Sequence, residues 1–341
     1  MRTIRRVSAI IIGFVFFLAG IFKLMDPIGS ALVVEEYLGF FHLGFLKFSA
    51  YFLGFVSSFL ETILGIALIT GVWRKLTGAV CGVFLGIFTI ITAILLIVNP
   101  QMDCGCFGEV IELTHLQSFI KNLILCSLWA LAFIPFREQE PTRKIKFISF
   151  AVAGVSSALF FLYSSFSIPM MDFTDLKTGT EIEEYTVFFS NFSGEYADSL
   201  LYEDRVLIAS VYNPDKLSER KWQIIEQQMK EAESIGYTTL ILANSTPERI
   251  EKSVDSHYIL SNCYFTDRKV LLSLNRSNGG FSYIADGQVI AKWSINKPPR
   301  EDKLAELYGE NTTEALISEN NGPRLRMQAF LLYVFAVMLL L

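Results

Sequence analysis

Five long apolar segments, interrupted by few charges, constrain this chain more than any other feature. A helix needs roughly 20 apolar residues, at about 1.5 Å each, to cross a hydrocarbon core that is ~30 Å thick. The segments are residues 7–25, 50–70, 78–98, 119–136 and 147–168. A sixth segment, residues 327–341, has only 15 residues, and we interpret it as a short span or a clipped one. The pattern argues against a soluble enzyme and predicts five or six membrane spans.

The first segment can also be compared with a cleaved secretory signal, because residues 1–6 are basic and an apolar run follows them. No A-x-A cleavage site follows that run, which ends in Phe22-Lys-Leu-Met-Asp-Pro27. We therefore predict a retained membrane helix.

Composition argues against a nucleic-acid-binding protein. Apolar residues make up 52% of the 341 positions, charged residues 18%, and the formal net charge is −5. The charge is uneven, since residues 1–170 hold 12 Lys and Arg against 9 Asp and Glu, whereas residues 171–341 hold 17 against 25. Such a split predicts two bodies in two environments. We expect the lipid bilayer as a partner and no nucleic acid.

The short loops predict the orientation, because cytoplasmic loops carry an excess of Lys and Arg. The basic residues that fall on one side of the membrane are Arg2, Arg5, Arg6, Arg74, Lys75, Arg137, Arg143, Lys144 and Lys146. The loop of residues 99–118 has no Lys or Arg and contains acidic residues. We therefore predict a multi-pass protein of the bacterial inner membrane with a cytoplasmic N-terminus. Residues 99–118 and 169–326 would face the periplasmic, extracytoplasmic side.

Glu61 lies inside the second segment, where a carboxylate is unfavourable and normally has a partner within the bundle. Lys23 is the nearest candidate by charge, but at helical rise the depths of the two residues differ by about 10 Å or more. Two interpretations stay open: a structural ion pair or protonated acid, and a contact to a proton or a quinone headgroup. The interrupted residues 27–50 predict a helix that lies on the outer surface.

Cys104 and Cys106 carry the main chemical signal. They lie in Asp103-Cys-Gly-Cys-Phe-Gly108, on the predicted oxidising side, where paired thiols form and exchange disulfides. A bridge across one intervening residue departs from relaxed disulfide geometry and is easily reduced. The glycines let the backbone bend tightly around such a bridge.

Three interpretations of this cysteine pair remain. One is a dithiol that passes electrons, and one is a structural disulfide, within the chain or to another chain. The third is a metal site that adds Asp103 and His115, which is disfavoured because zinc prefers four ligands at recognisable spacing. Cys81 and Cys126 lie inside apolar segments, and we predict that they are packing residues.

Three stretches of the membrane part are distinctive when taken together. They are Phe17-Leu-Ala-Gly-Ile-Phe-Lys-Leu-Met-Asp-Pro27, Glu61-x3-Gly65 and Asp103-Cys-Gly-Cys-Phe-Gly108. Together they resemble the MauE/DoxX-like family of four-helix integral membrane proteins over about residues 1–137. The resemblance implies a role in extracytoplasmic thiol or respiratory redox chemistry, and in methylamine utilisation a link to maturation of a disulfide-rich dehydrogenase subunit. It implies Cys104 and Cys106 as the redox pair, and Lys23, Asp26 and Glu61 as polar groups inside the membrane or at its edge.

The second half of the chain alternates short apolar runs with amphipathic segments, which predicts an α/β domain. We predict strands at residues 185–191, 206–212, 238–243, 281–285 and 288–293, and helices at 214–234, 247–254, 267–275 and 301–308. Asp286-Gly287 is typical of the turn of a β-hairpin. This order, and the run from Gly280 to Trp293, resemble the thioredoxin-like fold over about residues 185–295.

The thioredoxin-like resemblance implies a redox C-x-x-C at the start of the helix after the central strand, and a cis-proline before the hairpin. This chain has Asn213-Pro-Asp-Lys216 and Gly279-Gly280 at those positions. Because Asn or Lys cannot replace a thiolate nucleophile, we predict a degenerate thioredoxin-like domain that binds or positions a partner. Cys263 is predicted to be buried, or to meet the Cys104 and Cys106 pair.

These patterns divide the chain into four parts. They are a membrane domain of about four spans (1–137), a cytoplasmic loop with a fifth span (138–170), the extracytoplasmic domain (171–310) and a final segment (311–341). Residues 296–323 are polar and contain prolines, which predicts a tether. The predicted fold is a polytopic α-helical membrane protein, a four-helix bundle plus additional transmembrane helices, with an extracytoplasmic α/β thioredoxin-like domain.

The predicted function is a membrane accessory protein of extracytoplasmic thiol–disulfide or respiratory redox chemistry. Cys104 and Cys106 would exchange electrons with an extracytoplasmic partner protein, and a membrane quinone near Glu61 is a candidate electron sink. The alternative is a non-enzymatic anchor or assembly factor, with a MauE-like maturation role, in which the cysteines only hold their loop.

Overall fold

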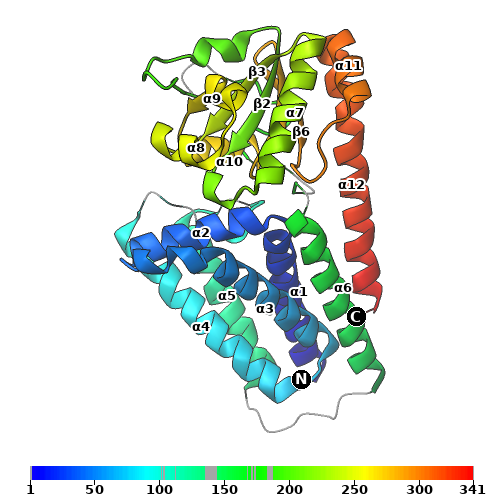
Figure 1. Ribbon diagram of the computed structural model, residues 1–341. Coiled ribbons are helices and arrows are strands. Elements are labelled where there is room, and N and C mark those ends of the chain that lie inside the picture. The colour runs from blue at the N-terminus through cyan, green and yellow to red at the C-terminus, as the bar shows by residue number, and fades with distance from the viewer. Residues whose placement is uncertain are drawn as a thin grey trace. The chain divides into compact units, whose positions relative to one another are not determined.

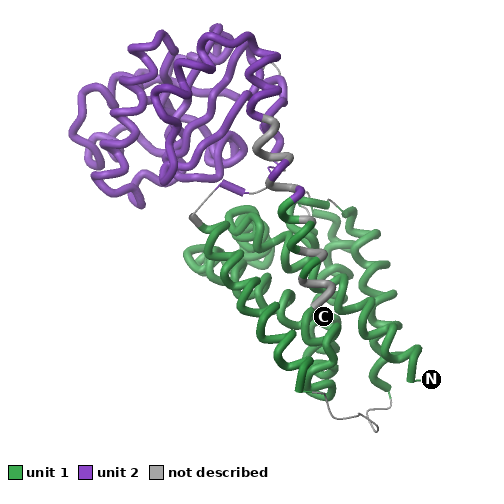
Figure 2. The backbone as a smooth tube through the Cα atoms, turned by 90° about the vertical axis from the view of Figure 1, so that its right-hand side faces the viewer, with its two compact units in different colours: residues 1–165, 329–341 green, residues 166–328 purple. Residues whose placement is uncertain are grey.

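The computed structural model describes residues 2–100, 102, 104–111, 113–134, 144–166, 168–169, 172, 174–182 and 187–340. The chain divides into two compact units, which Figure 2 shows in different colours. Unit 1 comprises residues 1–165 and 329–341, and unit 2 comprises residues 166–328. Long helices dominate unit 1, whereas unit 2 combines a β-sheet with shorter helices (Figure 1).

Within the described residues, five helices of unit 1 are long and apolar enough to cross a membrane. Their bounds are α1 (Arg2–Met25), α3 (Ala50–Thr70, preceded by the 3₁₀ helix η1, Gly44–Ser49), α4 (Arg74–Val98), α5 (His115–Phe133) and α6 (Lys144–Phe166). The helices lie on the five apolar segments, so these segments are confirmed as helical. Apolar side chains such as Ile90 and Ile148 are exposed on them, as expected of surfaces that face lipid.

Glycines let α1 and α3 pack backbone against backbone, as small residues do between membrane helices. A Cβ atom added at Gly20 would overlap Thr62, and one added at Gly65 would overlap the backbone of Phe17. This antiparallel register brings Lys23 to Glu61, with Nζ 2.8 Å from Oε1.

The predicted gap in depth between Lys23 and Glu61 is therefore wrong. That gap takes residue 50 as the outer end of the second span. In the structure the first turns of α3 pack along α2 (Pro27–Phe40), where a Cβ at Gly54 would lie 3.1 Å from the carbonyl oxygen of Ser30. Glu61 consequently lies close to the end of α1.

Helix α2 runs across the end of the long helices of unit 1 (Figure 1). Asp26 starts it, because its Oδ1 accepts a hydrogen bond of 3.0 Å from the backbone N of Gly29 and Pro27 occupies the first turn. The buried residues of α2 include Ser30 and Ala31, so one side of the helix covers the bundle. The predicted helix in residues 27–50 is present, over Pro27–Phe40.

Most of the predicted tether, residues 296–323, is helical. Helix α11 (Glu301–Gly309) is followed by α12 (Thr312–Leu340), which continues through Pro323. Two interactions that composition does not reveal start α12: Oδ1 of Asn311 accepts a hydrogen bond from the backbone N of Glu314, and Ala315 is buried in the core of unit 2. In unit 1, the ring of Phe330 lies 6.0 Å from that of Phe160.

Unit 2 contains a five-stranded sheet in the order β4-β3-β2-β5-β6. The strands are β2 (Arg205–Val211), β3 (Thr238–Ala243), β4 (Cys263–Phe265), β5 (Gly280–Ala285) and β6 (Gln288–Trp293). β2 pairs parallel with β3 and antiparallel with β5. The β5–β6 hairpin turns at Asp286 and Gly287, whose φ values of 49° and 72° are the positive pair that such a turn requires.

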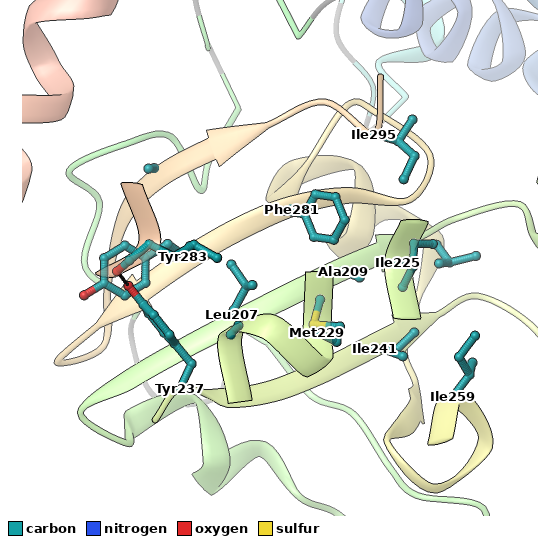
Figure 3. Close-up of a cluster of buried hydrophobic side chains, with 14 of the residues drawn as sticks. Leu207, Ala209, Ile225, Met229, Tyr237, Ile241, Ile259, Phe281, Tyr283 and Ile295 are labelled. Carbon is teal, nitrogen blue, oxygen red and sulfur yellow. Dashed lines mark hydrogen bonds between the residues drawn. The ribbon is translucent and has the colours of Figure 1, made fainter. Parts of the chain in front are cut away.

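Helices cover both faces of this sheet. They are α7 (Glu219–Ile235), α8 (Pro247–Ser253), α9 (His257–Ser261) and α10 (Arg268–Leu274), with the 3₁₀ helices η2 (Asp198–Tyr202) and η3 (Pro214–Lys216). Since side chains alternate along a strand, Leu207 and Ala209 pack with Ile225 and Met229 of α7 in one core cluster (Figure 3). Val206 and Ile208 belong to a second cluster that includes Leu271 of α10.

Two parts of the unit 2 prediction differ from the structure. The predicted strand at 185–191 is not one in its described residues, because only Ser190 forms bridges, to Tyr196 and Phe265. The apolar side chains that suggested it, Val187 and Phe189, are buried in the core instead. Helix α9 and strand β4 were not predicted, since each is too short to show a periodic pattern.

Candidate redox site

The first turn of α5 positions the site. Thr114 precedes the helix, and its Oγ1 accepts a hydrogen bond from the backbone N of Gln117, whose side chain in turn accepts one from the backbone N of Thr114. This reciprocal capping box fixes where α5 begins. His115 and Ser118 therefore lie on the first turn, next to the cysteine loop.

Cys104 and His115 form a hydrogen-bonded pair. Sγ of Cys104 lies 3.0 Å from Nδ1 of His115, and Nε2 of His115 lies 3.0 Å from the carbonyl oxygen of Pro100. Because a carbonyl oxygen only accepts, Nε2 carries a proton, and in the tautomer that has its one proton there Nδ1 is an acceptor that faces the thiol. The arrangement is that of a thiol beside a general base.

Cys106 faces the same helix turn but is less buried. Its Sγ lies 3.7 Å from Oγ of Ser118, which is buried. Between the cysteines, Gly105 has a φ of +56°, and a Cβ there would overlap the side chain of Val33. Any other side chain would be strained at this point, so the two sulfurs are held by a turn that strongly favours glycine.

Tyr37 of α2 ties the cysteine loop to the bundle. Its hydroxyl donates a hydrogen bond of 2.8 Å to the carbonyl oxygen of Cys104. Burial raises the pKa of Tyr37 above its ordinary value, and the neighbouring Cys106 and Cys104 raise that pKa further. The hydroxyl therefore stays protonated, and it remains a donor throughout the physiological pH range.

Lys23 and Glu61 form a two-pronged ion pair inside the bundle. Nζ of Lys23 lies 2.8 and 2.9 Å from the two carboxylate oxygens, and Glu61 is only 2% exposed. The ammonium also lies 5.9 Å from the centre of the Phe88 ring. A charge inside a membrane bundle needs such a partner, and Lys23 provides it for Glu61.

A cavity of about 260 Å³ connects these groups. Its lining includes Cys104 and Cys106 together with Lys23 and Glu61. Apolar walls come from α1, α4 and α5, and the lining residue Asn122 donates a hydrogen bond of 3.1 Å to Oγ1 of Thr92. Of the five predicted site residues, the cavity joins these four. Asp26 is not among the lining residues, and it caps α2 instead.

His115 and Tyr37 are the site residues that sequence reasoning missed. His115 was considered only as a metal ligand, and the capping-box pattern from Thr114 to Gln117 was the signal that could have placed it at a helix start beside the loop. Asp103, the other proposed ligand, lies outside the described residues. Among the residues that the structure describes, no group of three or more His, Cys, Asp or Glu is arranged to hold a metal ion.

Of the other three cysteines, Cys81 and Cys263 are buried, and Cys126 is partly buried against the core of unit 1. Cys81 is fully buried in the unit 1 core, and Sγ of Cys126 lies 3.4 Å from Oγ1 of Thr89. Cys263 on β4 is 2% exposed in the core of unit 2, and burial raises the pKa of its thiol to about 12. The predicted burial of Cys263 is confirmed.

The first part of the chain is similar to a known protein family. The family described as "Methylamine utilisation protein MauE" matches residues 1–135. Residues 1–135, which hold the first four of the five candidate membrane spans in the described part of the chain, are thus MauE-like. "Protein TlpB" of Flavobacterium psychrophilum is 29% identical over 154 residues, which make up 44% of this chain and 40% of that protein. The match thus spans about two fifths of this relative's length. No solved structure matches the chain.

The MauE-like part and the apolar helices together make this a multi-pass membrane protein. Five helices long and apolar enough to span lie within the described residues, and the MauE match covers four of them completely. Their exposed apolar side chains contact the lipid bilayer.

Proposed function

We propose that this chain is a membrane accessory protein of extracytoplasmic thiol–disulfide chemistry, with Cys104 and Cys106 as its redox pair. The observation that carries the proposal is the hydrogen bond between Sγ of Cys104 and Nδ1 of His115, whose tautomer is set by the carbonyl oxygen of Pro100. A thiolate is the reactive form of cysteine, and a histidine beside the thiol provides a base that generates it. The MauE-like match supports an accessory role in redox or maturation chemistry.

The exchange reaction uses the two thiols in sequence. Cys106, the more exposed thiol, loses its proton and attacks one sulfur of a partner's disulfide, which releases the partner's other sulfur as a thiolate. His115 then takes the proton of Cys104, and the Cys104 thiolate attacks Cys106, so that the partner leaves with two thiols and the Cys104–Cys106 bond forms. The reverse sequence oxidises the partner. The glycine turn at Gly105 allows the small ring to close.

Unit 2 supports the interpretation of a degenerate thioredoxin-like domain that binds a partner protein. The stretch that replaces the redox motif, residues 213–216, follows the central strand β2. There the side chain of Asn278 accepts a hydrogen bond of 3.0 Å from the backbone N of Asn213 and donates one of 2.6 Å to its carbonyl oxygen. The exposed rings of Phe188 and Tyr196 are of the kind enriched at protein interfaces.

The proposed location is the bacterial inner membrane. Five crossings that start from a cytoplasmic N-terminus would leave the cysteine loop and unit 2 on the periplasmic side, in agreement with the distribution of Lys and Arg. A membrane-impermeant maleimide applied to intact, reductant-treated cells should label Cys106. Labelling that appears only after lysis would contradict this orientation.

The redox proposal is tested by titrating the purified full chain in glutathione buffers and trapping thiols by alkylation with a mass shift. We expect Cys104 and Cys106 to change state together, as one two-electron step, and either single Cys→Ser variant to abolish that step. Cys81→Ser should leave the step unchanged. If both cysteines kept a single state across the titration, the proposal would be wrong.

The alternative function is a non-enzymatic anchor with a MauE-like maturation role. The hydrogen bond from Tyr37 to the Cys104 carbonyl favours it, since it holds the loop without sulfur chemistry. This alternative predicts a pair that resists reduction, and Cys→Ser variants that still support assembly of the partner. The same titration therefore separates the two functions.

A further inference from the structure

The cavity beside the cysteine pair is large enough to hold a small molecule. We infer that it binds the headgroup of a membrane quinone, which accepts the electrons of the Cys104–Cys106 pair. This inference rests on the proposed redox function and adds its electron acceptor. Three features carry it: the size and walls of the cavity, its polar groups, and the position of the sulfurs.

The size and walls select a small lipid-soluble molecule. The cavity has a volume of about 260 Å³, enough for a substituted ring and too small for a folded protein segment. It lies among membrane-spanning helices, with Phe16, Leu85, Phe88 and Ile91 in its lining. Aromatic and aliphatic walls favour a flat apolar ring. A ligand reaching it through lipid must itself be apolar.

The polar groups favour a ring that carries oxygen atoms. Lys23 lines the cavity, and its ammonium has three protons to donate, of which the two contacts to Glu61 account for two. A carbonyl oxygen of a quinone is a suitable acceptor for a further proton. As the ring is reduced, negative charge grows on this oxygen, and a nearby ammonium stabilises it. A hydrocarbon ligand would use none of these groups.

The sulfurs complete the site. Cys104 is 4% exposed, yet it lines the cavity, so its sulfur is accessible to a molecule inside the cavity and shielded from a large partner. Cys106 lines the same cavity and is more exposed, so it suits the contact with a protein. One pair of thiols can thus face a protein through Cys106 and a small oxidant through the cavity.

The reaction balances without another reactant. Two S–H bonds break and one S–S bond forms, which releases two electrons and two protons. The quinone takes up both electrons, and its two carbonyl oxygens become the two hydroxyls of the quinol. His115 accepts the proton of Cys104, and Lys23 supplies a proton to one reduced oxygen. The proton of Cys106 restores Lys23, and the proton held by His115 passes to the second oxygen, so the two thiol protons end on the two quinol hydroxyls.

The test uses the full chain in lipid nanodiscs, reduced and freed of reductant, with decyl-ubiquinone as the probe. We expect about one quinol, measured by ultraviolet absorbance, for each Cys104–Cys106 pair oxidised, measured by alkylation. Ile91→Trp fills the cavity and should slow this reaction at least ten-fold. Ile90→Trp is the matched control, because Ile90 is the neighbouring residue on α4, is 64% exposed and does not line the cavity.

A second measurement does not depend on how the variants fold. A photoreactive azido-quinone should crosslink to peptides of α1 or α4 that line the cavity, and excess decyl-ubiquinone should compete. If the pair titrates in glutathione buffers but forms no quinol, or if both Trp variants react equally, or if the label maps elsewhere, the quinone inference is overturned and the redox function stands. If the pair does not titrate at all, it is the redox function that fails.

Discussion

At the scale of single residues, the candidate site depends on side chains that are far apart in sequence. The spacing of Cys104 and Cys106 identified them at once, because a pair of thiols is recognisable without a fold. His115 was not identified as their partner, since a lone histidine has no pattern and only the folded loop brings Nδ1 to Sγ. Lys23 and Glu61 could be recognised from the sequence, because charged residues are rare inside apolar membrane segments.

His115→Gln should slow the chemistry of Cys104 without unfolding the protein. The variant keeps a polar side chain but removes the base, so we expect the second-order rate of Cys104 with a small disulfide at pH 7 to fall roughly 10- to 100-fold. Mass spectrometry after quenched mixing measures it. His42→Asn is the control, because His42 is exposed and has a φ of 59°, which Asn tolerates. Equal rates in the two variants would exclude a base role for His115.

Removing one member of the ion pair should be worse than removing both. Lys23→Met leaves Glu61 buried without its partner, which we expect to lower the free energy of unfolding by about 3 kcal/mol. The double variant Lys23→Met with Glu61→Met leaves no charge uncompensated, and it should recover more than half of that loss. Denaturation in mixed micelles measures both values. A double variant less stable than Lys23→Met would show that the pair stabilises the bundle by itself.

Cys263 should make unit 2 sensitive to alkaline pH. Its pKa is about 12 in the folded protein against 9.0 as the reference value, so the folded state holds a proton that the unfolded state loses above about pH 9. The stability from this thiol is fully present below pH 9 and is lost as pH rises towards 12. We expect a loss of about 1 kcal/mol by pH 10, measured by urea denaturation. Cys263→Ala should show a shallower slope between pH 8 and pH 10.

At the scale of elements, apolar runs located the five candidate membrane-spanning helices of the described residues, because runs of this length suit a membrane span. Contacts between elements could not be located in this way. The depth of Glu61 depends on where glycines let α1 approach α3, and a count along one helix does not contain that register. Residues 312–323 are polar enough to predict a tether, and they are helical because Ala315 packs in a core built by distant residues.

Substitutions of glycine should separate close packing from helix propensity. Gly65→Ala places a Cβ against the backbone of Phe17, whereas Gly86→Ala on α4 meets nothing within 4 Å. We expect Gly65→Ala to lower the free energy of unfolding by about 1–3 kcal/mol. Gly86→Ala should leave it unchanged or raise it slightly, because Ala is the better helix former. Thermal unfolding in detergent compares the two, and equal shifts would argue against the α1–α3 contact.

At the scale of the whole molecule, the charge difference between the two halves predicted two bodies, and the chain does divide into two units. Each unit has its own core, with Leu85 and Leu125 in one and Leu207 and Ile241 in the other. The strand order of unit 2 rests on pairing between residues far apart, such as β2 with β5. Periodicity predicts the strands, but it does not predict which strands become neighbours.

Leu207→Ala should affect one unit and spare the chemistry of the other. Leu207 is fully buried in unit 2, and we expect its truncation to lower the stability of that unit by about 2–5 kcal/mol. Scanning calorimetry of the full chain should show one transition moving to lower temperature. The glutathione titration of Cys104 and Cys106 should keep its midpoint at temperatures below that transition. A shifted midpoint would show that the two units share stability.

The pairing of Lys23 with Glu61 places two charged groups inside the bundle without giving its interior a net charge. The two opposite charges sum to zero, so an uncharged ligand that enters from the lipid meets no net charge there. If a transient anion forms in the cavity, the flexible Lys23 side chain can move its ammonium towards that anion, while the shorter Glu61 side chain stays close to its helix. Lys23 is thus neutralised by Glu61 in the absence of an anion, and it can stabilise an anion when one forms in the cavity.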